Sequence, residues 1–309
     1  MTAAPVPAVT VVVPTVDRTV LLGRCLDGLS RQRDLPPRSV QILVVHDGDA
    51  GVVRLLAERG VEGLQIAARG VSAKRNAGWR AARAPWVAFT DDDCEPAPGW
   101  LAGLLAAAEK EPGADLAAGP VAPHPGDATV TGTFARTVNS EAPGFYPGCN
   151  QLVRVAALQR VGGFDERMHG GEDTDLAWRV IETTPGGEPP AWSDDALVWH
   201  AVRAVTFGQQ LRSLPRWSGL PLVARRHPQL RPLAHRRYFW KRSHTTGALA
   251  LAGLAGALVD RRALLLAAPH VVRRTREAGP RAGLQLAATD VAEVAVLVAG
   301  SVRYRRILL

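Results

Sequence analysis

The segment WVAFTDDD, residues 86–93, joins a short apolar run to three adjacent carboxylates. Trp86 to Thr90 follows Pro85 and has the length and apolar character of a buried strand. Neighbouring carboxylates repel one another, so Asp91 to Asp93 are costly to hold together unless a cation or solvent screens them. The segment therefore predicts a buried strand that ends in a polar site.

Strands of the same kind alternate with helical patterns before this segment. Val9 to Val13 is a β-branched run that ends at Pro14, and QILVV at 41–45 stops at the turn His46-Asp47-Gly48-Asp49. A third apolar run covers Leu64 to Ala68. The helices predicted between them cover 19–31, 52–59 and, after a Ser72 cap, 72–83. This alternation favours an α/β fold with a mostly parallel sheet covered by helices on both faces.

The carboxyl ends of the strands are where ligands gather in such a sheet. The residues that follow the four predicted strands are Pro14, Thr15, Asp47, Arg69 and the acidic triplet, Asp91–Asp93. Charged residues follow three of the four strands, and apolar packing alone does not require charge there. Oxygen-rich clusters suit Mg²⁺ or Mn²⁺, which also bind diphosphates, and the alternative for the triplet is a solvated acidic turn.

Two further positions near these strand ends have both a functional and a structural interpretation. Lys74 and Arg75, at the start of a predicted helix, suit either phosphate contacts or a solvated helix face. Asp47 can accept a hydrogen bond from a nucleobase or a ribose, or it can serve as a turn residue.

Two positions later in the chain could take part in proton transfer or metal binding. Glu172 and Asp173 open a predicted helix that runs to Glu182, where a carboxylate acts as a general base or simply favours the helix macrodipole. His200 follows a predicted strand, Ala196 to Trp199, and is either a metal ligand or a structural histidine.

The charge is divided unevenly along the chain. The 309 residues are 47% hydrophobic, enough for a large core, and carry a formal net charge of +8. Residues 1–200 contain 18 Lys and Arg against 25 Asp and Glu, whereas residues 201–309 contain 19 against 4, so the balances are −7 and +15. The two parts are expected to have different partners.

The cysteines and the N-terminus indicate a cytoplasmic protein. Cys25, Cys94 and Cys149 are odd in number and widely spaced, with neither a disulfide framework nor a zinc-binding pattern. The apolar residues Met1 to Val13 lack the basic flank of a signal peptide. We therefore expect a reducing compartment.

The C-terminal region, residues 206–309, combines arginine clusters, aromatic residues and apolar stretches. The stretch Thr245 to Val259 has 15 residues, fewer than the ~20 that span a bilayer as a helix. Further apolar stretches follow at 263–272 and 291–302. We expect amphipathic or re-entrant helices on an anionic leaflet, which would make the protein peripheral on the inner face of the cell membrane. The alternatives are a helical subdomain packed on the catalytic core and a full two-helix membrane hairpin.

Five segments, taken together and in order, resemble the family 2 glycosyltransferases with the GT-A fold. They are VTVVVPT (9–15), QILVVHDGD (41–49), SAKRNAGWRAARAPWVAFTDDD (72–93), VGGFDERMHGGEDTDLAWR (161–179) and VWH (198–200). The resemblance covers roughly the first two-thirds of the chain. It implies a GT-A domain, a Rossmann-like and mostly parallel sheet flanked by helices, over residues 1–205. The nucleotide-binding half would cover about 1–120 and the acceptor half about 121–205, followed by the basic, apolar helical region.

The resemblance also implies an inverting, metal-dependent transfer of a sugar from a nucleotide-diphosphate donor to an acceptor hydroxyl. Asp173, with Glu172 beside it, matches the catalytic base. Asp91 and Asp93 match the ends of the Asp-X-Asp motif that holds Mn²⁺ or Mg²⁺, and His200 matches a further ligand of some members. The donor contacts implied are Pro14, Thr15, Asp47, Arg69, Lys74, Arg75, Asp91 and Asp92, and the acceptor-side residues are Gly148, Cys149 and Asn150. A lipid-linked acceptor would suit a membrane position.

Two motifs depart from the usual family pattern. His46-Asp47-Gly48-Asp49 stands where the family usually has Asp-Asp-Gly-Ser, which bears on the base of the donor. The Gln-X-X-Arg-Trp motif of the processive synthases is absent from the sequence, since Ser213 to Trp217 is only a partial match. We therefore expect a non-processive enzyme.

Three other functions compete with this interpretation. A basic nucleic-acid-binding protein would account for the isoelectric point of about 10.2, but it leaves the acidic triplet and Glu172–Asp173 without a purpose, so we expect no nucleic-acid partner. A nucleotidyltransferase needs a Gly-rich phosphate loop after the first strand, and Pro14 to Arg18 is not one. A catalytically inactive scaffold of the same fold would bind nucleotide without turnover.

Overall fold

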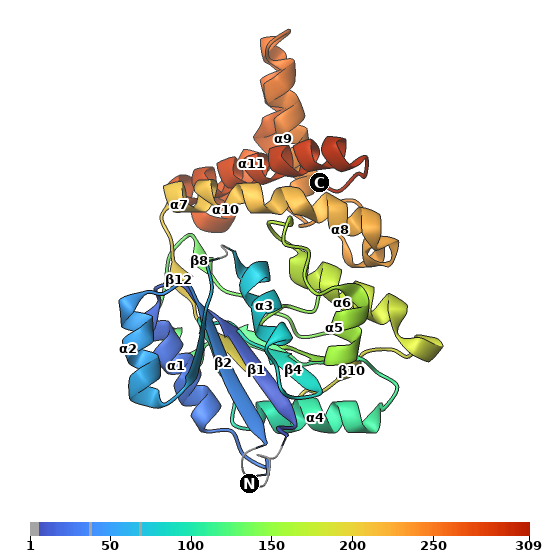
Figure 1. The fold of residues 1–309 in the computed structure, drawn as a ribbon. Coiled ribbons are helices and arrows are strands. Elements are labelled where there is room, and N and C mark those ends of the chain that lie inside the picture. The colour runs from blue at the N-terminus through green and yellow to red at the C-terminus, as the bar shows by residue number, and fades with distance from the viewer. Residues whose placement is uncertain (1–5, 37–38, 68–69) are drawn as a thin grey trace, which may run out of the picture. The chain divides into compact units, whose positions relative to one another are not determined.

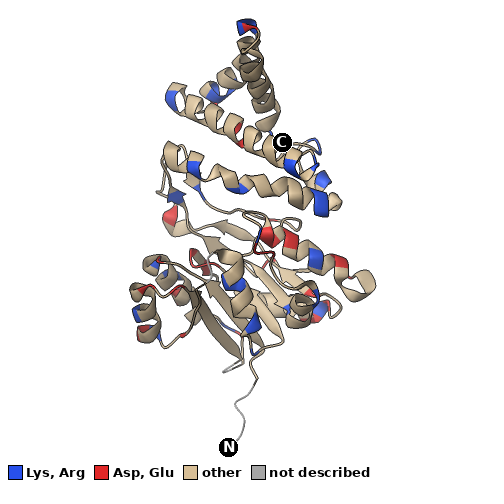
Figure 2. Cartoon of the chain, turned by 45° about the horizontal axis from the view of Figure 1, so that its top comes forward, with Lys and Arg blue, Asp and Glu red and all other residues tan. Residues whose placement is uncertain are grey.

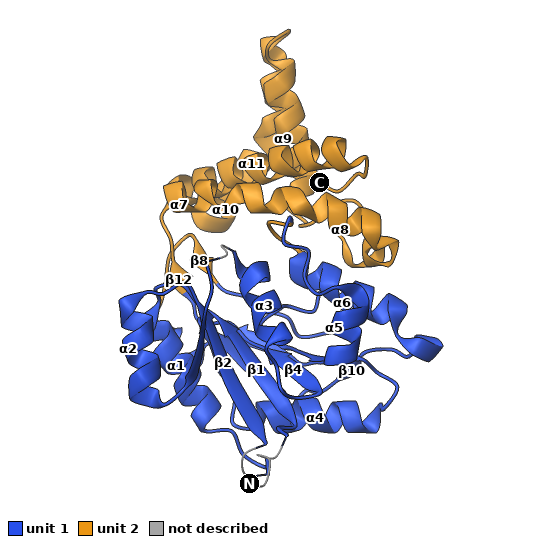
Figure 3. Ribbon diagram, in the orientation of Figure 1, with its two compact units in different colours: residues 1–129, 137–167, 172–202 blue, residues 130–136, 168–171, 203–309 orange. Residues whose placement is uncertain are grey.

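The computed structural model describes residues 6–36, 39–67 and 70–309 (Figure 1). These residues form two compact units, which Figure 3 shows in different colours. Unit 1 contains residues 1–129, 137–167 and 172–202, and unit 2 contains residues 130–136, 168–171 and 203–309.

Unit 1 is built on a seven-stranded sheet with the order β10-β6-β9-β4-β1-β2-β3. The strands are β1 (Val9–Pro14), β2 (Val40–His46), β3 (Glu62–Gln65), β4 (Trp86–Phe89), β6 (Leu116–Ala118), β9 (Gln151–Arg154) and β10 (Ala191–Trp192). β1 pairs in parallel with β2 and β4, and β2 pairs in parallel with β3. β9 is antiparallel to both β4 and β6. The sheet is therefore mixed but mostly parallel, and the predicted α/β class is confirmed.

Helices flank this sheet (Figure 1). They are α1 (Thr19–Ser30), α2 (Ala50–Arg59), α3 (Val71–Arg80), α4 (Trp100–Lys110), α5 (Val155–Val161) and α6 (Glu172–Thr183), with short 3-10 turns η1 (Pro125–Asp127) and η2 (Pro185–Gly187). A second, small sheet has the order β5-β11-β7, from β5 (Cys94–Pro96), β11 (Val198–His200) and β7 (Val121–Pro123). Because β5 follows the acidic triplet directly, this small sheet continues from the end of β4.

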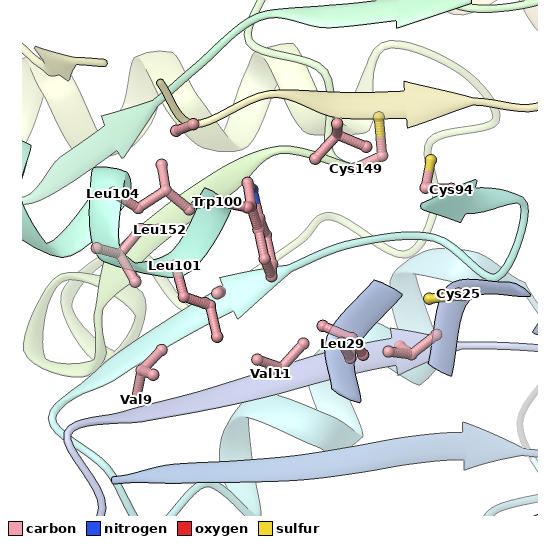
Figure 4. Close-up of a cluster of buried hydrophobic side chains, with 14 of the residues drawn as sticks. Val9, Val11, Cys25, Leu29, Cys94, Trp100, Leu101, Leu104, Cys149 and Leu152 are labelled. Carbon is pink, nitrogen blue, oxygen red and sulfur yellow. The ribbon is translucent and has the colours of Figure 1, made fainter. Parts of the chain in front are cut away.

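The side chains of β1 alternate between two apolar layers, because successive residues of a strand face opposite sides of a sheet. Val11 packs with Trp100 of α4 and the residues of α1 (Figure 4), whereas Val12 packs with Trp79 of α3 on the other face. The indole N–H of the buried Trp100 donates to Asn150 Oδ1 at 2.8 Å. A slip of one residue would exchange the two layers, so burial fixes the register and thus where each strand ends.

Two local expectations are wrong in detail, and one strand was not expected. The helix predicted at 72–83 covers Val71–Arg80, and Gly70 rather than Ser72 precedes it. The third strand is Glu62–Gln65, earlier than the predicted Leu64 to Ala68. The sequence pattern does not predict β9, because this strand depends on pairing with β4 and β6, which are distant in sequence.

Unit 2 is mainly helical (Figure 3). Its elements are β8 (Ala135–Arg136), β12 (Arg203–Ala204), α7 (Phe207–Arg212), η3 (Leu214–Gly219), α8 (Leu220–Arg226), η4 (Pro228–Leu233), α9 (His244–Gly256), η5 (Arg261–Ala267), α10 (Ala268–Ala278) and α11 (Pro280–Tyr304). Leu220, Ala224 and Leu297 form its apolar core with Trp217 and Trp240. The apolar stretches predicted as helices lie in α9, η5, α10 and α11.

Within the described part of the chain, α11 alone has the length and apolar composition of a membrane-crossing helix, with 39% of its most apolar window buried. The same helix buries Asp290 and Glu293, which form ion pairs with Arg274 and Lys241 inside unit 2. These ion pairs give α11 a packing role in unit 2.

Candidate active site

The carboxyl ends of β4, β1 and β2 lie side by side, since these strands are parallel neighbours. Lys74 of α3 links two of these ends: its Nζ donates to the Thr15 carbonyl oxygen at 2.5 Å and lies 3.4 Å from Asp47 Oδ2. Pro14 and Thr15 are buried, whereas the Asp47 side chain is 39% exposed. Of this group, Asp47 therefore has the side chain that is free to meet a ligand.

Arg75, the next residue on α3, connects the acidic triplet to α6. Its Nη2 donates to Asp91 Oδ1 at 2.6 Å, and its Nη1 lies 3.5 Å from Glu172 Oε1. Burial lowers the pKa of the guanidinium, but Asp91, Glu172 and Asp173 raise it above its ordinary value, so Arg75 stays charged. Lys74 and Arg75 are both buried, so the alternative of a solvated helix face is wrong for both.

Gly148 provides space for Arg75 and a hydrogen bond for Asp173. A Cβ at position 148 would lie 2.9 Å from Arg75 Cζ, which leaves no room for a larger residue unless the guanidinium shifts. The Gly148 N–H donates to Asp173 Oδ2 at 3.0 Å, and the Thr174 N–H donates to Asp173 Oδ1 at 2.8 Å. Both oxygens of the predicted base are thus oriented by backbone groups.

Glu172 lies in the same charged surroundings at the start of α6. Burial raises the pKa of its carboxyl, the neighbouring Asp173 raises it further, and Arg75 acts in the opposite direction. Carboxyl groups perturbed by burial and by a like charge are frequent in active sites, although structural ion-pair networks also produce them.

The members of the acidic triplet have different surroundings. Asp92 is fully buried: its Oδ2 accepts from Thr15 Oγ1 at 2.7 Å, and its Oδ1 pairs with Arg18. Burial raises the pKa of Asp92 to about 6, against the opposing effects of Arg18 and Thr15. The side chains of Asp91 and Asp93 are 24% and 9% exposed. Asp92 was predicted as a donor contact, but its burial makes it a support for Thr15 and Arg18.

Asp93 lies beside His200 and Cys94. The pairing of β5 with β11 places Cys94 opposite His200, and His200 Nε2 is 3.6 Å from Asp93 Oδ1. The ligand atoms of the three residues all lie within 4.8 Å of one another. His200 Nδ1 bonds to the Ala201 carbonyl oxygen at 2.9 Å, so in the neutral ring Nδ1 carries the hydrogen and Nε2 keeps its lone pair.

This donor set fits the divalent metal that the sequence predicts. Carboxylate oxygens suit Mn²⁺ and Mg²⁺, and an imidazole with a fixed tautomer can complete such a set. Asp91 and Asp93 are the triplet members whose side chains keep some exposure, 24% and 9%, and His200 lies against Asp93.

The predicted acceptor-side residues contribute mainly to the framework. The side chain of Asn150 is fully buried, with hydrogen bonds to Trp100 and to the carbonyl oxygens of Pro120 and Ala196. Cys149 is also buried. Asn150 therefore ties the strand ends together, and the neighbouring Gly148 acts through its backbone.

Arg18 is a site residue that the sequence analysis did not single out. Its Nη1 donates to Asp93 Oδ2 at 2.6 Å and its Nε donates to Asp92 Oδ2 at 3.2 Å. The available signal was a basic residue in the loop after the first strand, where the other three strand ends already showed charged residues. Arg69, a predicted donor contact, lies outside the described residues.

Part of this site lies in a segment that matches known proteins. Residues 10–161 match the family described as Glycosyl transferase family 2, a range that runs from β1 to the end of α5 and includes the acidic triplet. The chain is also 33% identical over 212 residues to the pre-mycofactocin glycosyltransferase of Mycobacterium tuberculosis, an alignment that covers 63% of this chain and 43% of that protein. The chain belongs to glycosyl transferase family 2.

A second relative of this family 2 chain is the validoxylamine A glucosyltransferase of Streptomyces hygroscopicus subsp. limoneus. It is 28% identical over 279 residues, which cover 76% of this chain and 59% of that protein. The family 2 chain thus spans about half the length of these two relatives, 43% of one and 59% of the other.

Two solved structures share the fold of the family 2 chain. The mannosyltransferase PcManGT from Pyrobaculum calidifontis, in complex with GDP-Man and Mn²⁺, superposes with a TM-score of 0.60 at 21% identity, over 98% of this chain and 88% of that one. S. aureus TarS 1–349 in complex with UDP-GlcNAc superposes with a TM-score of 0.53 at 16% identity, over 96% and 92%. These likenesses confirm the predicted GT-A fold.

Proposed function

We propose that this chain is an inverting, metal-dependent glycosyltransferase that moves a sugar from a nucleotide-diphosphate donor to an acceptor hydroxyl. The two relatives are named as glycosyltransferases, and the two structural neighbours were solved with GDP-Man and Mn²⁺ or with UDP-GlcNAc. These names and ligands support a nucleotide-sugar donor and a divalent metal for this chain.

The observation that carries the proposal is the position of Arg75. Its guanidinium bonds to Asp91 at 2.6 Å and lies 3.5 Å from Glu172, so one guanidinium group separates the acidic triplet from the start of α6. A donor diphosphate held at the triplet would therefore lie close to Asp173. Asp173 could then reach the hydroxyl of an acceptor that lies next to the anomeric carbon of the donor.

The donor nucleotide is assigned to the carboxyl ends of β1 and β2. Asp47 has an exposed carboxylate that can accept from a base or a ribose hydroxyl. Lys74, which lies 3.4 Å from Asp47, and Arg75, which lies against Asp91, are buried cations that attract the diphosphate. Pro14 and Thr15 are buried at the end of β1, and the Thr15 carbonyl oxygen holds Lys74 in place.

The transfer step uses the groups at the start of α6. Asp91, Asp93 and His200 would hold the divalent metal, which when bound offsets charge on the leaving nucleoside diphosphate. Asp173 takes the proton of the acceptor hydroxyl as that oxygen attacks the anomeric carbon from the side opposite the diphosphate. The new C–O bond forms as the bond to the diphosphate breaks, so one displacement inverts the configuration.

We also propose that the enzyme adds a single sugar per binding event. The segment Ser213 to Trp217 has serine in place of the glutamine of the processive motif. With one donor and one acceptor, the expected product carries one added sugar.

A screen of nucleotide sugars by thermal shift, with and without Mn²⁺, tests donor and metal together. A ligand stabilises only the state that binds it, so the correct donor should raise the melting temperature, and by more with Mn²⁺. Incubation of that donor with candidate acceptors then tests transfer, and the Asp173→Asn variant should lose product while it keeps the thermal shift.

Two other results would replace the proposal. Nucleotide binding without turnover, with no effect of Asp173→Asn, would identify an inactive scaffold of the same fold. A salt-sensitive gel shift, with no binding of nucleotide sugars, would identify a nucleic-acid-binding protein.

A further inference from the structure

Unit 2 exposes its most apolar segment. We name residues 244–267, which comprise α9, the following turn and η5, the apolar hairpin. In this hairpin Leu258 is 90% exposed, Val259 94% and Leu265 73%. The ribbon of the hairpin extends away from α8 and α11 of the same unit (Figure 1). Neighbouring exposed leucines and valines of this kind mark an interaction surface.

The glycines of α9 explain why the large side chains face outward. A Cβ at Gly253 would lie 2.7 Å from the Ala263 carbonyl oxygen, and a Cβ at Gly256 would lie 3.0 Å from Ala263 Cβ. The two arms of the hairpin therefore touch through glycine and alanine. This close approach leaves no space for leucines between the arms, so Leu254 and Leu265 lie on the outside, where both are exposed.

Charge is confined to the tip of the hairpin. Residues 247–259 contain no charged side chain, and Asp260, Arg261 and Arg262 follow; Figure 2 shows the uncharged stem and the charged tip. Asp260 is used internally, since its Oδ1 accepts from the Arg262 N–H at 2.9 Å. Arg261 and Arg262 are exposed and line one shallow groove with Leu265.

The charge of the surrounding chain narrows the choice of partner. Residues 203–309 contain 19 Lys and Arg against 4 Asp and Glu. Each of these four carboxylates is occupied inside unit 2: Asp260 caps η5, Glu277 pairs with Arg273, Asp290 with Arg274, and Glu293 with Lys241. The region therefore carries a net charge of +15, which attracts an anionic partner and opposes association with a second copy of the same surface.

We propose that the apolar hairpin inserts into the boundary between headgroups and acyl chains of an anionic bilayer. Leu258, Val259 and Leu265 enter the acyl region, and Arg261 and Arg262 remain at the phosphates, where long basic side chains keep their charge in the polar layer. α9 has 13 residues and is about 20 Å long, less than the ~30 Å hydrocarbon core, so the hairpin occupies a single leaflet. Nucleic acid would match the arginines but would leave the exposed leucines in water.

Flotation with lipid vesicles tests this proposal without any measurement of sugar transfer, so its outcome is independent of the proposed enzyme activity. The full chain should float with vesicles of equimolar phosphatidylglycerol and phosphatidylcholine, and should remain below with phosphatidylcholine alone. The Arg261→Gln/Arg262→Gln variant should bind the anionic vesicles about 25-fold less tightly at low salt, from roughly fivefold per arginine.

Apolar variants complete the test. Leu258→Asp/Val259→Asp should weaken binding to anionic vesicles by at least about tenfold, because two apolar side chains lose their burial in the bilayer. Val20→Asp is the matched control, since Val20 is also exposed, at 83%, but lies on α1 of unit 1. Circular dichroism melting curves should match the wild type for both variants, because the altered side chains make little contact in the fold.

Three results would overturn the proposal. The first is no binding to anionic vesicles, or binding that Leu258→Asp/Val259→Asp leaves unchanged. The second is a dimer in sedimentation velocity that the same variant converts to a monomer, which would assign the hairpin to a second copy. The third is binding of single- or double-stranded nucleic acid in preference to the vesicles, with loss in the arginine variant only.

Discussion

Two side-chain clusters, one in each unit, look alike by ligand type and spacing. The sheet-edge cluster is Asp93, Cys94 and His200, and the helical cluster is His244, Asp290 and Glu293. In each cluster the possible ligand atoms lie within 4.8 Å of one another. The clusters differ in the charges around them, and this difference separates a ligand site from a structural link.

The sheet-edge cluster is short of positive charge. Carboxylates outnumber cations around it: Asp91, Asp92, Asp93, Glu172 and Asp173 surround the guanidinium groups of Arg18 and Arg75. Like charges gathered at this density are stabilised by a further cation, and a divalent metal with oxygen ligands supplies one.

The helical cluster has its charges balanced. Lys241 Nζ donates to Glu293 at 2.7 Å, and Arg274 Nε donates to Asp290 at 2.7 Å. His244 Nε2 adds a contact to Glu293 at 2.9 Å. Each carboxylate of this cluster is already matched by one basic side chain, so a divalent metal would add surplus positive charge. The cluster therefore serves to join α9, α10 and α11. Charge balance, more than ligand type or distance, therefore identifies the candidate site.

The largest expected effect belongs to the sheet-edge region. Asp173→Asn should lower kcat for sugar transfer by about 10³-fold, because general base catalysis contributes 10²–10⁴-fold. The free energy of unfolding and the affinity for the donor should change little. Steady-state kinetics with the donor from the screen measure the first, and calorimetric titration measures the second. The exposed Glu188→Gln is the control, and a similar loss in that variant would contradict a specific role for Asp173.

The helical cluster should respond in stability and not in activity. Glu293→Ala should lower the free energy of unfolding by about 3 kcal/mol, the lower end of the range for breaking a buried ion pair, because Lys241 is partly exposed. Glu277→Ala is the matched control: its pairs with Arg273 and Arg274 are exposed, and the expected loss is below about 1 kcal/mol. Urea unfolding measures the loss of stability in both variants. Equal losses would contradict a larger contribution from the buried pair than from the exposed pairs.

Metal addition should distinguish the clusters directly. At about 100 times its dissociation constant, Mn²⁺ should raise the free energy of unfolding by about 2.7 kcal/mol. The increment should disappear in Asp93→Asn and in His200→Ala, and it should persist in Glu293→Gln. If the increment were lost in Glu293→Gln and kept in Asp93→Asn, the metal would bind the helical cluster of unit 2, which would contradict the assignment of the site to the sheet edge.

Removal of a carboxylate from the sheet edge should cost little stability. Asp93→Asn breaks the pair with Arg18 but also relieves repulsion from Asp91 and Asp92, so the free energy of unfolding should stay within about 1 kcal/mol of the wild type. Urea unfolding without added metal tests this, beside Glu293→Ala. A loss as large as that of Glu293→Ala would mean that the sheet-edge charges are as balanced as those of the helical cluster.

The smallest expected effects are pH dependences from two buried groups of unit 2, Glu293 of the helical cluster and His270, whose Nε2 lies 3.5 Å from Asp290 Oδ2. Burial lowers the pKa of His270 below its ordinary value of 6.5, while Asp290 acts in the opposite direction and Arg273 and Arg274 act with burial. The unfolded chain therefore takes up the proton first, so stability should fall as the pH drops below 6.5. Urea titrations across this range should show a shallower fall in His270→Leu, and an unchanged slope in that variant would exclude His270 as the source.

A second loss of stability should follow at lower pH. Burial raises the pKa of Glu293. Hydrogen bonds and charges from His244 and Lys241 lower it by a larger amount together, so the pKa lies below the ordinary 4.5. The stability from this carboxylate is complete above pH 4.5 and is lost as the pH falls through the lowered value. Glu293→Gln should remove this acid step.

Local patterns in the sequence predicted the parts of the fold that burial imposes on consecutive residues. The runs at 9–13, 41–45 and 86–90 became β1, β2 and β4, and the placement of polar residues at their ends located the sheet edge. The helix that begins at Glu172 was also anticipated, because its acidic first turn and apolar spacing are local signals.

The remaining features depend on contacts between distant residues. Strand β9 is antiparallel to two neighbours that are far apart in the chain. The sequence left both phosphate contacts and a solvated helix face open for Lys74 and Arg75. The carboxylates of Asp47, Asp91 and Glu172 allow both cations to be buried. Thr15 and Arg18 both bond to Asp92 and so determine which aspartate of the triplet is buried. The order of three adjacent aspartates in the sequence does not show this.

The most direct test of the central claim is a calorimetric titration of the wild type and Asp93→Asn with GDP and UDP, each with and without Mn²⁺. A divalent ion at the sheet edge that neutralises a diphosphate should make binding of one nucleotide depend on Mn²⁺, and Asp93→Asn should weaken that binding by at least about tenfold. Equal affinity with and without the metal, or wild-type affinity in Asp93→Asn, would contradict the account.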